Sequence, residues 1–496
     1  MPPSAPLAMD STPACRSAEE RAPTPRAGRR VSSRSPRVLG HLIRMLFQKT
    51  RAPGPAIARP NLRHSLTSFS ARPSSMLKDR WPPSQGWTAS RQLPLMPNVP
   101  TPFLSDLASV AVQVVLLAAQ VHFFLWLRRR AVQSGSRWHK AVSWLVLILG
   151  LALVASSDLL AWDRLFFSRR APAAWRLLAG AWAAGSFGAY LCLLALRVLG
   201  AVTPAGRRAR LPAAANSGAL TRRELTGLAA RLAVTAPFAA AAYGTFIGRT
   251  QFDLREVDLT IANLPADLEG IRIAQLTDIH CGAYLSLKDL ETVVGMVNET
   301  KPHLALVTGD LITRPGDPLE GCLGRLAKIR AEAGIYHCLG NHERYCGSED
   351  FVEEHGNSLG MEILRQRAAP LRFGKARLNL CGVDYQRTNR AYLRHGRELL
   401  VPDAFNVLLS HNPNVFPVAE GMGYDLVIAG HTHGGQVTLE IVEQWANAGL
   451  FFTPFVAGPY RSGNSLLYVS RGIGTINLPM RIGSLPEVTL LRLRRA

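Results

Sequence analysis

Cysteine is scarce in this sequence, with seven residues in 496, and no two of them form a C-x-x-C pair. A structural zinc site of the ribbon type needs closely spaced thiolates, so a zinc ribbon is unsupported. The sequence by itself assigns no disulfide. Cys281 and Cys338 stand beside polar motifs, and we predict that they are small buried hydrophobic residues.

Acidic residues are also scarce in the first half of the chain. Lys and Arg outnumber Asp and Glu by 16 to 4 in residues 1–95 and by 17 to 4 in residues 96–252, whereas in residues 253–496 the 24 basic residues are fewer than the 27 acidic ones. The formal net charge of +22 would suggest a nucleic acid or an anionic membrane surface as a partner if it were evenly spread. Because the last part carries −3, the distribution argues against a nucleic-acid partner.

Residues 1–95 show no sustained apolar period and are rich in Arg, Pro, Ser and Ala. Such a composition cannot bury enough apolar surface to fold, so it predicts a disordered basic tail. Three interpretations stay open: an Arg- and Ser-rich transit peptide, a tail for an anionic surface, or a segment that is not translated because synthesis begins at Met96.

Long apolar stretches follow at residues 103–127, 141–162 and 177–196, which are 25, 22 and 20 residues long. About 20 residues cross a bilayer as a helix. A fourth stretch, 225–247, is weaker because it contains Arg231 and Pro237. We therefore expect residues 96–252 to form a membrane region with about four transmembrane helices.

The basic residues between these stretches predict the topology. The loops at 128–140 and 197–224 together carry eleven Lys and Arg residues, and the loop at 163–176 carries four. Cytoplasmic loops hold the excess of positive charge, so residues 253–496 are predicted to lie outside the cytoplasm. The stretch TRRELTG, residues 221–227, resembles a twin-arginine export signal, although such signals normally lie at an N-terminus.

Residues 253–496 have the pattern of an α/β domain. Apolar runs of strand length occur at 271–276, 304–307, 335–339, 407–409 and 426–429, and residues 286–299 follow helical spacing. Strands that alternate with helices predict a sheet covered by helices. The five runs end in TDIHCG, TGDLI, LGNHE, LSHNP and AGHTHGG, and ligands gather beyond strand ends in such folds.

This series of motifs resembles the calcineurin-like metallophosphoesterase superfamily over about residues 268–475, because D-x-H, G-D, G-N-H-[DE], H and G-H-x-H occur in order. The GHTHGGQ turn after a membrane segment resembles the bacterial membrane-associated phosphoesterases, which implies an integral protein of a bacterial cell or inner membrane. The resemblance implies two divalent metal ions. It assigns Asp278, His280 and His433 to one ion, Asn341, His411 and His431 to the other, and Asp310 to both.

By the same resemblance, His342 faces the phosphate and protonates the leaving alkoxide. Mixed imidazole, carboxylate and amide ligands suit Mn, Fe, Zn or Ni. Glycines beside His431 and His433 allow positive φ and close backbone approach. Arg471 is either a second phosphate contact or part of a structural salt bridge, and possible supporting residues are Glu343, Thr277 and Gln436.

The expected function is hydrolysis of a phosphomonoester or phosphodiester by hydroxide held between two metals. The position next to a bilayer suggests a phospholipid or a nucleotide-linked lipid as substrate. Two alternatives remain open: a catalytically silent metal-binding receptor or scaffold, and a nuclease, which the charge of residues 253–496 disfavours.

Overall fold

The structure, a computed structural model, describes residues 101–133, 136–155, 173–202, 222–387, 392–439, 446–451 and 453–496. The predicted basic tail, residues 1–95, lies outside the described residues. So do Met96, residues 156–162 of the second predicted membrane span, and most of the loop at 163–176.

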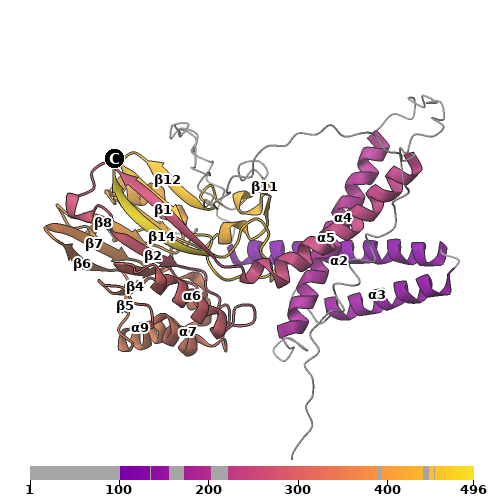
Figure 1. The fold of residues 1–496 in the computed structure, drawn as a ribbon, viewed down its shortest axis with the longest axis horizontal. Helices are drawn as coiled ribbons and strands as arrows, with labels where there is room; N and C mark the ends of the chain where they lie inside the picture. The colour runs from indigo at the N-terminus through magenta and orange to yellow at the C-terminus, as the bar shows by residue number, and fades with distance from the viewer. Residues whose placement is uncertain are drawn as a thin grey trace, which may run out of the picture. The chain divides into compact units, whose positions relative to one another are not determined.

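The four apolar stretches are helical wherever they are described. They form α2 (Thr101–Gln133), α3 (Arg137–Ala155), α4 (Ala173–Val202) and α5 (Arg222–Phe246) (Figure 1). Among the described residues, one segment, Ala173–Val198 of α4, is long and apolar enough to cross a membrane, and α3 holds a shorter apolar stretch, Lys140–Gly150. The expectation of about four spans is therefore supported only in part, because α5 contains Arg231 and Pro237 within its apolar stretch and part of the second stretch is outside the described residues.

These helices pack through a small aromatic cluster and leave other apolar side chains exposed. Phe123 and Phe124 of α2 contact Trp182 of α4 and Phe238 of α5. Large apolar side chains elsewhere on the helices are exposed, including Trp138, which is 81% exposed. Contiguous exposed apolar surface marks contact with a membrane or another protein, which favours a membrane environment for this region.

Residues 253–496 contain two six-stranded sheets, and the first holds both the first and the last strand of this part of the chain. Its strand order is β1-β14-β2-β3-β4-β5, and the strands are β1 (Asp253–Ile261), β14 (Glu487–Arg495), β2 (Arg272–Leu276), β3 (Leu304–Val307), β4 (Ile335–His337) and β5 (Glu362–Ile363). Strands β2 to β5 are parallel to one another, and β14 runs antiparallel to β2. The carboxyl ends of β2, β3 and β4 therefore meet at one edge.

The second sheet has the order β12-β13-β9-β8-β7-β6. Its strands are β12 (Gly458–Ser462), β13 (Ser465–Val469), β9 (Leu426–Ala429), β8 (Phe405–Leu409), β7 (Ala376–Gly382) and β6 (Arg367–Phe373). Strands β7, β8, β9 and β13 are parallel, and β6 and β12 are antiparallel edge strands. A short hairpin of β10 (Thr438–Leu439) and β11 (Ala446–Asn447) stands apart.

The two sheets pack face to face, with helices on their outer faces. Ile273 and Leu306 of the first sheet share one buried cluster with Val407 and Ile428 of the second. A second cluster joins the first sheet to α6 (Leu287–Glu299), α7 (Leu319–Leu326) and α9 (Glu349–Ser358), which lie beside it in Figure 1. A third joins the second sheet to α10 (Phe416–Met422). The result is a four-layered α/β domain.

The predicted strands and helix of this domain are confirmed, with small shifts at their ends. Two of the five runs coincide with β3 and β9, and the other three overlap β2, β4 and β8. Helix α6 begins after Ser286, whose side chain accepts a hydrogen bond from the Asp289 amide in a capping box. The sequence interpretation did not identify β1, β5 and β14 of the first sheet or β6, β7, β12 and β13 of the second, so it did not predict that the strands form two sheets.

Candidate active site

The candidate ligands lie where five parallel strands end. Strand β2 leads to Asp278 and His280, β3 leads to Asp310, and β4 leads into the short helix α8 (Asn341–Cys346). In the second sheet, β8 leads to His411 and β9 leads to His431 and His433. The site therefore joins the two sheets at the same edge of the sandwich.

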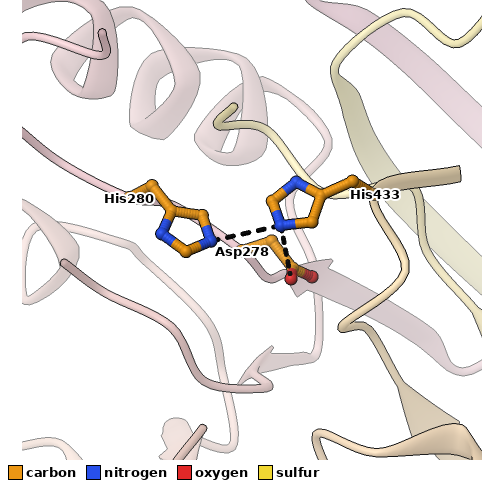
Figure 2. Close-up of side chains that lie close together, drawn as sticks. All are labelled: Asp278, His280 and His433. Atoms are coloured by element: carbon orange, nitrogen blue, oxygen red, sulfur yellow. Dashed lines mark hydrogen bonds and ion pairs between the residues drawn. The ribbon is translucent and has the colours of Figure 1, made fainter. Parts of the chain in front are cut away.

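One group consists of Asp278, His280 and His433 (Figure 2). His433 Nε2 lies 3.2 Å from Asp278 Oδ1 and 3.2 Å from His280 Nε2. All three side chains are buried. Two imidazole nitrogens and a carboxylate oxygen thus converge on one point, as a divalent metal requires.

A second group consists of Asp310, His411 and His431. His411 Nε2 lies 3.1 Å from Asp310 Oδ2 and 3.1 Å from His431 Nδ1. The same Asp310 oxygen is 3.6 Å from His280 Nε2 in the first group. Asp310 thus stands between the two groups, where the predicted bridging ligand would have to be.

Most of the candidate ligands have unusual backbone conformations. Asp278, His280, Asp310, His431 and His433 have φ values of 50°, 47°, 59°, 76° and 53°. Positive φ is uncommon for residues other than glycine, and such strain clusters at functional sites when the surrounding structure holds it. The fold therefore holds these five side chains in positions that an unconstrained chain would seldom adopt.

Gly430 is the first glycine of the GHTHGGQ turn, and neighbouring atoms leave no room for a side chain there. A Cβ at this position would lie 2.1 Å from Thr277 Oγ1 and 2.4 Å from Asp278 Oδ2. The absence of a side chain lets the His431 amide reach Asp278, with N–O distances of 3.1 and 2.9 Å. A side chain at residue 430 would therefore displace a candidate metal ligand.

Burial keeps three of the four candidate ligand histidines neutral. It lowers the pKa of His280 to about 3, the pKa of His431 to about 4, and the pKa of His433 well below its usual value. A histidine must be neutral to bind a metal, so these side chains meet that condition at neutral pH.

The fourth histidine, His411, shows that the buried carboxylates of the site favour a positive charge beside them. Burial opposes protonation of His411, but Asp310 and Asp278 outweigh it and raise the pKa of His411 to about 10. Burial also raises the pKa of Asp278 to about 6. Two buried carboxylates therefore draw positive charge into the site, and divalent cations would supply that charge in place of a proton.

Asn341 provides an independent test of whether these residues fit a metal. Its side chain is 5% exposed, and its Oδ1 atom has no hydrogen-bond partner within the described part of the chain. An unpaired buried amide oxygen is costly unless another group binds it. A bound metal ion would meet that need, so the unpaired oxygen is consistent with Asn341 as a candidate ligand.

His342 lies next to both groups and has a defined orientation. Its Nδ1 is 2.7 Å from the Thr313 carbonyl oxygen, so Nδ1 carries the hydrogen and donates it. Its ring centroid lies 4.8 Å from that of His280. Nε2 is therefore the nitrogen that remains to take up or release a proton beside the candidate metal site.

Glu343 holds together the loops that carry the ligands. Its buried carboxylate accepts hydrogen bonds from the amides of Asp310, Leu311 and Gly340, at 2.9, 2.6 and 2.7 Å. The amide of His342 in turn donates to Asp310 Oδ1 at 2.9 Å. Glu343 thus fixes the end of β3 relative to α8.

The other supporting residues of the sequence interpretation lie in three different places. Thr277 Oγ1 lies 2.9 Å from Asp278 Oδ2 and orients that carboxylate. Gln436 instead bonds both backbone polar groups of Ile476, and Arg471 Nε lies 3.7 Å from Glu487 Oε2. This contact favours the interpretation of Arg471 as part of a structural salt bridge over its interpretation as a phosphate-binding residue.

The predicted burial of Cys281 and Cys338 is confirmed, since both have no exposed surface. The six cysteines within the described residues are free thiols.

Arg481 is a supporting residue that sequence reasoning missed. Its fully buried guanidinium donates to the carbonyl oxygen of His433 at 2.8 Å and to that of Arg471 at 2.9 Å. Its backbone amide donates to the Gly244 carbonyl at the end of α5, at 3.1 Å. No sequence signal distinguished Arg481 from other arginines, because its role arises from the burial of a loop distant in sequence.

Comparison with known proteins agrees with this geometry. Residues 271–435 match the family described as calcineurin-like phosphoesterase. Residues 271–435 are therefore similar to a calcineurin-like metallophosphoesterase domain, and this similarity supports metal-dependent hydrolysis of phosphoesters as the activity of the domain.

Three relatives illustrate the range of similar proteins. A Danio rerio protein named transmembrane protein with metallophosphoesterase domain is 31% identical over 49% of this chain and 57% of its own length. The uncharacterized metallophosphoesterase YkuE of Bacillus subtilis is 27% identical over 55% of this chain and 98% of its own length. Phosphodiesterase YaeI of Escherichia coli is 28% identical over 45% of this chain and 82% of its own length.

These relatives include a vertebrate protein as well as bacterial ones. The comparisons therefore support the phosphoesterase domain, whereas the narrower bacterial membrane-associated type is not confirmed. The name of the Danio rerio relative and the apolar helix α4 both favour a membrane protein.

Replacing Asp310 tests its place between the two groups. Because one carboxylate oxygen lies within 3.6 Å of a histidine from each group, Asp310→Ala is expected to lower the content of bound metal from about two equivalents to less than one. Metal is measured by elemental analysis of the purified full chain, with Asp267→Ala on the surface as control. An Asp310→Ala protein that keeps two equivalents would contradict the bridging position.

Replacing Arg481 tests whether the buried guanidinium positions His433. Arg481→Met removes the bonds to the carbonyl oxygens while keeping an apolar stem, and it is expected to weaken metal affinity by about 10- to 100-fold, as the loss of a partner of a metal ligand typically does. Competition with a chelator measures this affinity, and Arg330→Met on the surface is the control. Circular dichroism checks the fold, and unchanged metal affinity in a folded variant would rule out the positioning role.

Proposed function

We propose that the full protein is a membrane-anchored hydrolase of phosphate esters that works with two divalent metal ions. The observation that carries this proposal is the convergence of six candidate ligands, Asp310 among them, from the ends of β2, β3, β8 and β9. Phosphomonoesters and phosphodiesters both remain within the proposed substrate class.

Two divalent ions, when bound, supply an activated water at neutral pH and offset negative charge on the phosphoryl group. The residues of the chain provide the surroundings for that chemistry. Asp278 and Asp310 bring only two negative charges to the buried site, so a site with two divalent cations has a surplus of positive charge. A phosphate dianion is attracted to such a site, although residues 253–496 as a whole are slightly acidic.

His342 is proposed to move the proton of the reaction. With Nδ1–H donating to the Thr313 carbonyl, a protonated His342 carries its second proton on Nε2. Transfer of that proton to the leaving oxygen removes the need to expel an alkoxide. The hydrogen bond to Thr313 holds the ring in place during the transfer.

The membrane part of the proposal rests on the helical region. Helix α4 is long and apolar enough to cross a bilayer, and α2 to α4 expose large apolar side chains. The proposed topology has four spans, with residues 253–496 outside the cytoplasm. A catalytic domain held at a bilayer would meet lipid-linked phosphate esters, so a phospholipid or a nucleotide-linked lipid is the proposed substrate.

The role of His342 predicts a dependence on the leaving group. His342→Ala is expected to slow turnover of an alkyl phosphate by about 100- to 10,000-fold, and turnover of 4-nitrophenyl phosphate by much less, because nitrophenolate leaves without a proton. Steady-state kinetics of the full chain in detergent measures both rates. Metal content should stay at that of the unaltered protein, and an equal loss for both esters would assign His342 another role.

The proposed topology is tested with a single accessible cysteine. Glu354 of α9 is exposed and is therefore a suitable position for that cysteine. In a variant without native cysteines, Glu354→Cys is expected to react with a membrane-impermeant thiol reagent in intact cells. Arg137→Cys, at the first residue of α3, is the control that should react only after lysis. The reverse pattern would place the catalytic domain in the cytoplasm.

A further inference from the structure

A cavity of about 230 Å³ lies beside the candidate metal site and has no place in the proposed chemistry so far. Its walls include three arginines, Arg344, Arg387 and Arg394, together with Asp384 and Tyr385. Arg344 belongs to α8, the same short helix that begins with Asn341. The other four residues belong to the segment that follows β7.

Two sets of contacts place this cavity next to the metal ligands. The ring of Tyr385 lies 5.8 Å from the ring of His431 and 6.2 Å from that of His411, between centroids. The carbonyl of the neighbouring Gln386 accepts a hydrogen bond from Asn412, the residue after His411, at 2.8 Å. The cavity wall is therefore fixed to a loop that carries a candidate ligand.

The lining of the cavity carries more positive than negative charge. Its one carboxylate among the described residues is Asp384, which bonds to Arg365 outside the cavity at 3.1 and 3.2 Å, and Arg365 also pairs with Asp350 and Glu353. None of the three lining arginines has a carboxylate partner in the described ranges. Three guanidinium groups and one carboxylate thus line one cavity, and the balance of charge is positive.

Arginine clusters of this kind recognise phosphate, because the guanidinium fork matches two phosphate oxygens and keeps its charge at every accessible pH. A phosphate monoester carries nearly two negative charges and three acceptor oxygens. The cavity therefore suits a phosphate group better than a neutral sugar or an apolar chain.

The position relative to His342 indicates which part of a substrate would enter. His342 lies beside the leaving oxygen in the proposed function, and Tyr345 packs against its ring at 5.5 Å on the same helix as Arg344. A chain that extends from the leaving oxygen past His342 would therefore reach the arginines of the cavity.

We propose that the cavity is a binding site for a second phosphate, carried by the leaving group of the substrate. This inference rests on the proposed function and narrows its substrate class to esters with two phosphate groups, one cleaved at the metal site and one held by Arg344, Arg387 and Arg394. The second phosphate can belong to a soluble molecule or to a lipid headgroup.

Two substrates with the same type of leaving oxygen test this site. For the full chain in detergent, kcat/KM is expected to be about 100-fold higher for propane-1,3-diol bisphosphate than for propyl phosphate. The ratio should fall about fivefold in each of Arg344→Gln, Arg387→Gln and Arg394→Gln, and nearly to one in the triple variant if the three contacts act independently. Arg330→Gln, on the surface, is the control and should leave both values unchanged.

The outcomes separate this site from the proposed function. Hydrolysis of neither ester by the unaltered protein would contradict the proposed function alone. Hydrolysis of both with equal kcat/KM, or a ratio that the arginine variants do not change, would overturn the second phosphate site. Binding of the bisphosphate to the Asp310→Ala protein, measured by calorimetry, tests the site without turnover and should weaken in the triple arginine variant.

Inhibition distinguishes the two sources of the phosphate. Micelles of a nonionic detergent that contain phosphatidic acid are compared with soluble propane-1,3-diol bisphosphate as inhibitors of 4-nitrophenyl phosphate hydrolysis. Stronger inhibition by the micelles, relieved in the triple variant, would assign a lipid headgroup, and stronger inhibition by the soluble compound would assign a soluble substrate. Inhibition by neither would overturn the proposal.

Discussion

The active-site structure depends on one buried carboxylate. Asp310 lies in the left-handed region of backbone conformation, at φ 59°, with its oxygen between histidines from the two sheets. Removing a carboxylate from water is costly unless charge and hydrogen bonds compensate for the loss. The amide of His342 donates one hydrogen bond to Asp310, and the remaining negative charge of this buried carboxylate favours cations nearby. The proposed hydrolysis follows if divalent metal ions provide this compensating positive charge.

Hydrogen bonds of two buried side chains hold the loops around Asp310 in place. Glu343 ties the loops after β3 and β4 together through three backbone amides, and Arg481 ties the His433 turn to neighbouring carbonyl groups. Both side chains are buried and bond mainly to backbone. Bonds of this kind hold ligand positions more firmly than contacts between flexible side chains. The strained φ values of the ligands are a consequence of that rigidity.

The site also has direct connections to its surroundings. Arg481 bonds with its side chain to the metal-site turn and with its backbone to Gly244 of α5. On another side, Tyr385 separates the histidines of the second group from the cationic cavity. A single residue thus links the candidate metal ligands to the helical region, and another links them to the cavity. The proposed function of the helical region is membrane anchoring, and that of the cavity is substrate selection.

The sequence by itself determined the local features. Apolar runs identified β2, β3, β4, β8 and β9, because a strand and its end are set by short-range pattern. The motifs directly after these runs implied the candidate ligands through their resemblance to a known family, and the structure groups six of these residues. Only the tertiary structure decided what depends on contacts between distant segments. The pairing of β14 beside β2, the burial of Arg481 and the gathering of Arg344 with Arg387 and Arg394 each join residues far apart in the chain. No local period encodes such contacts, since they arise when the two sheets pack against each other and bring their loops to one edge.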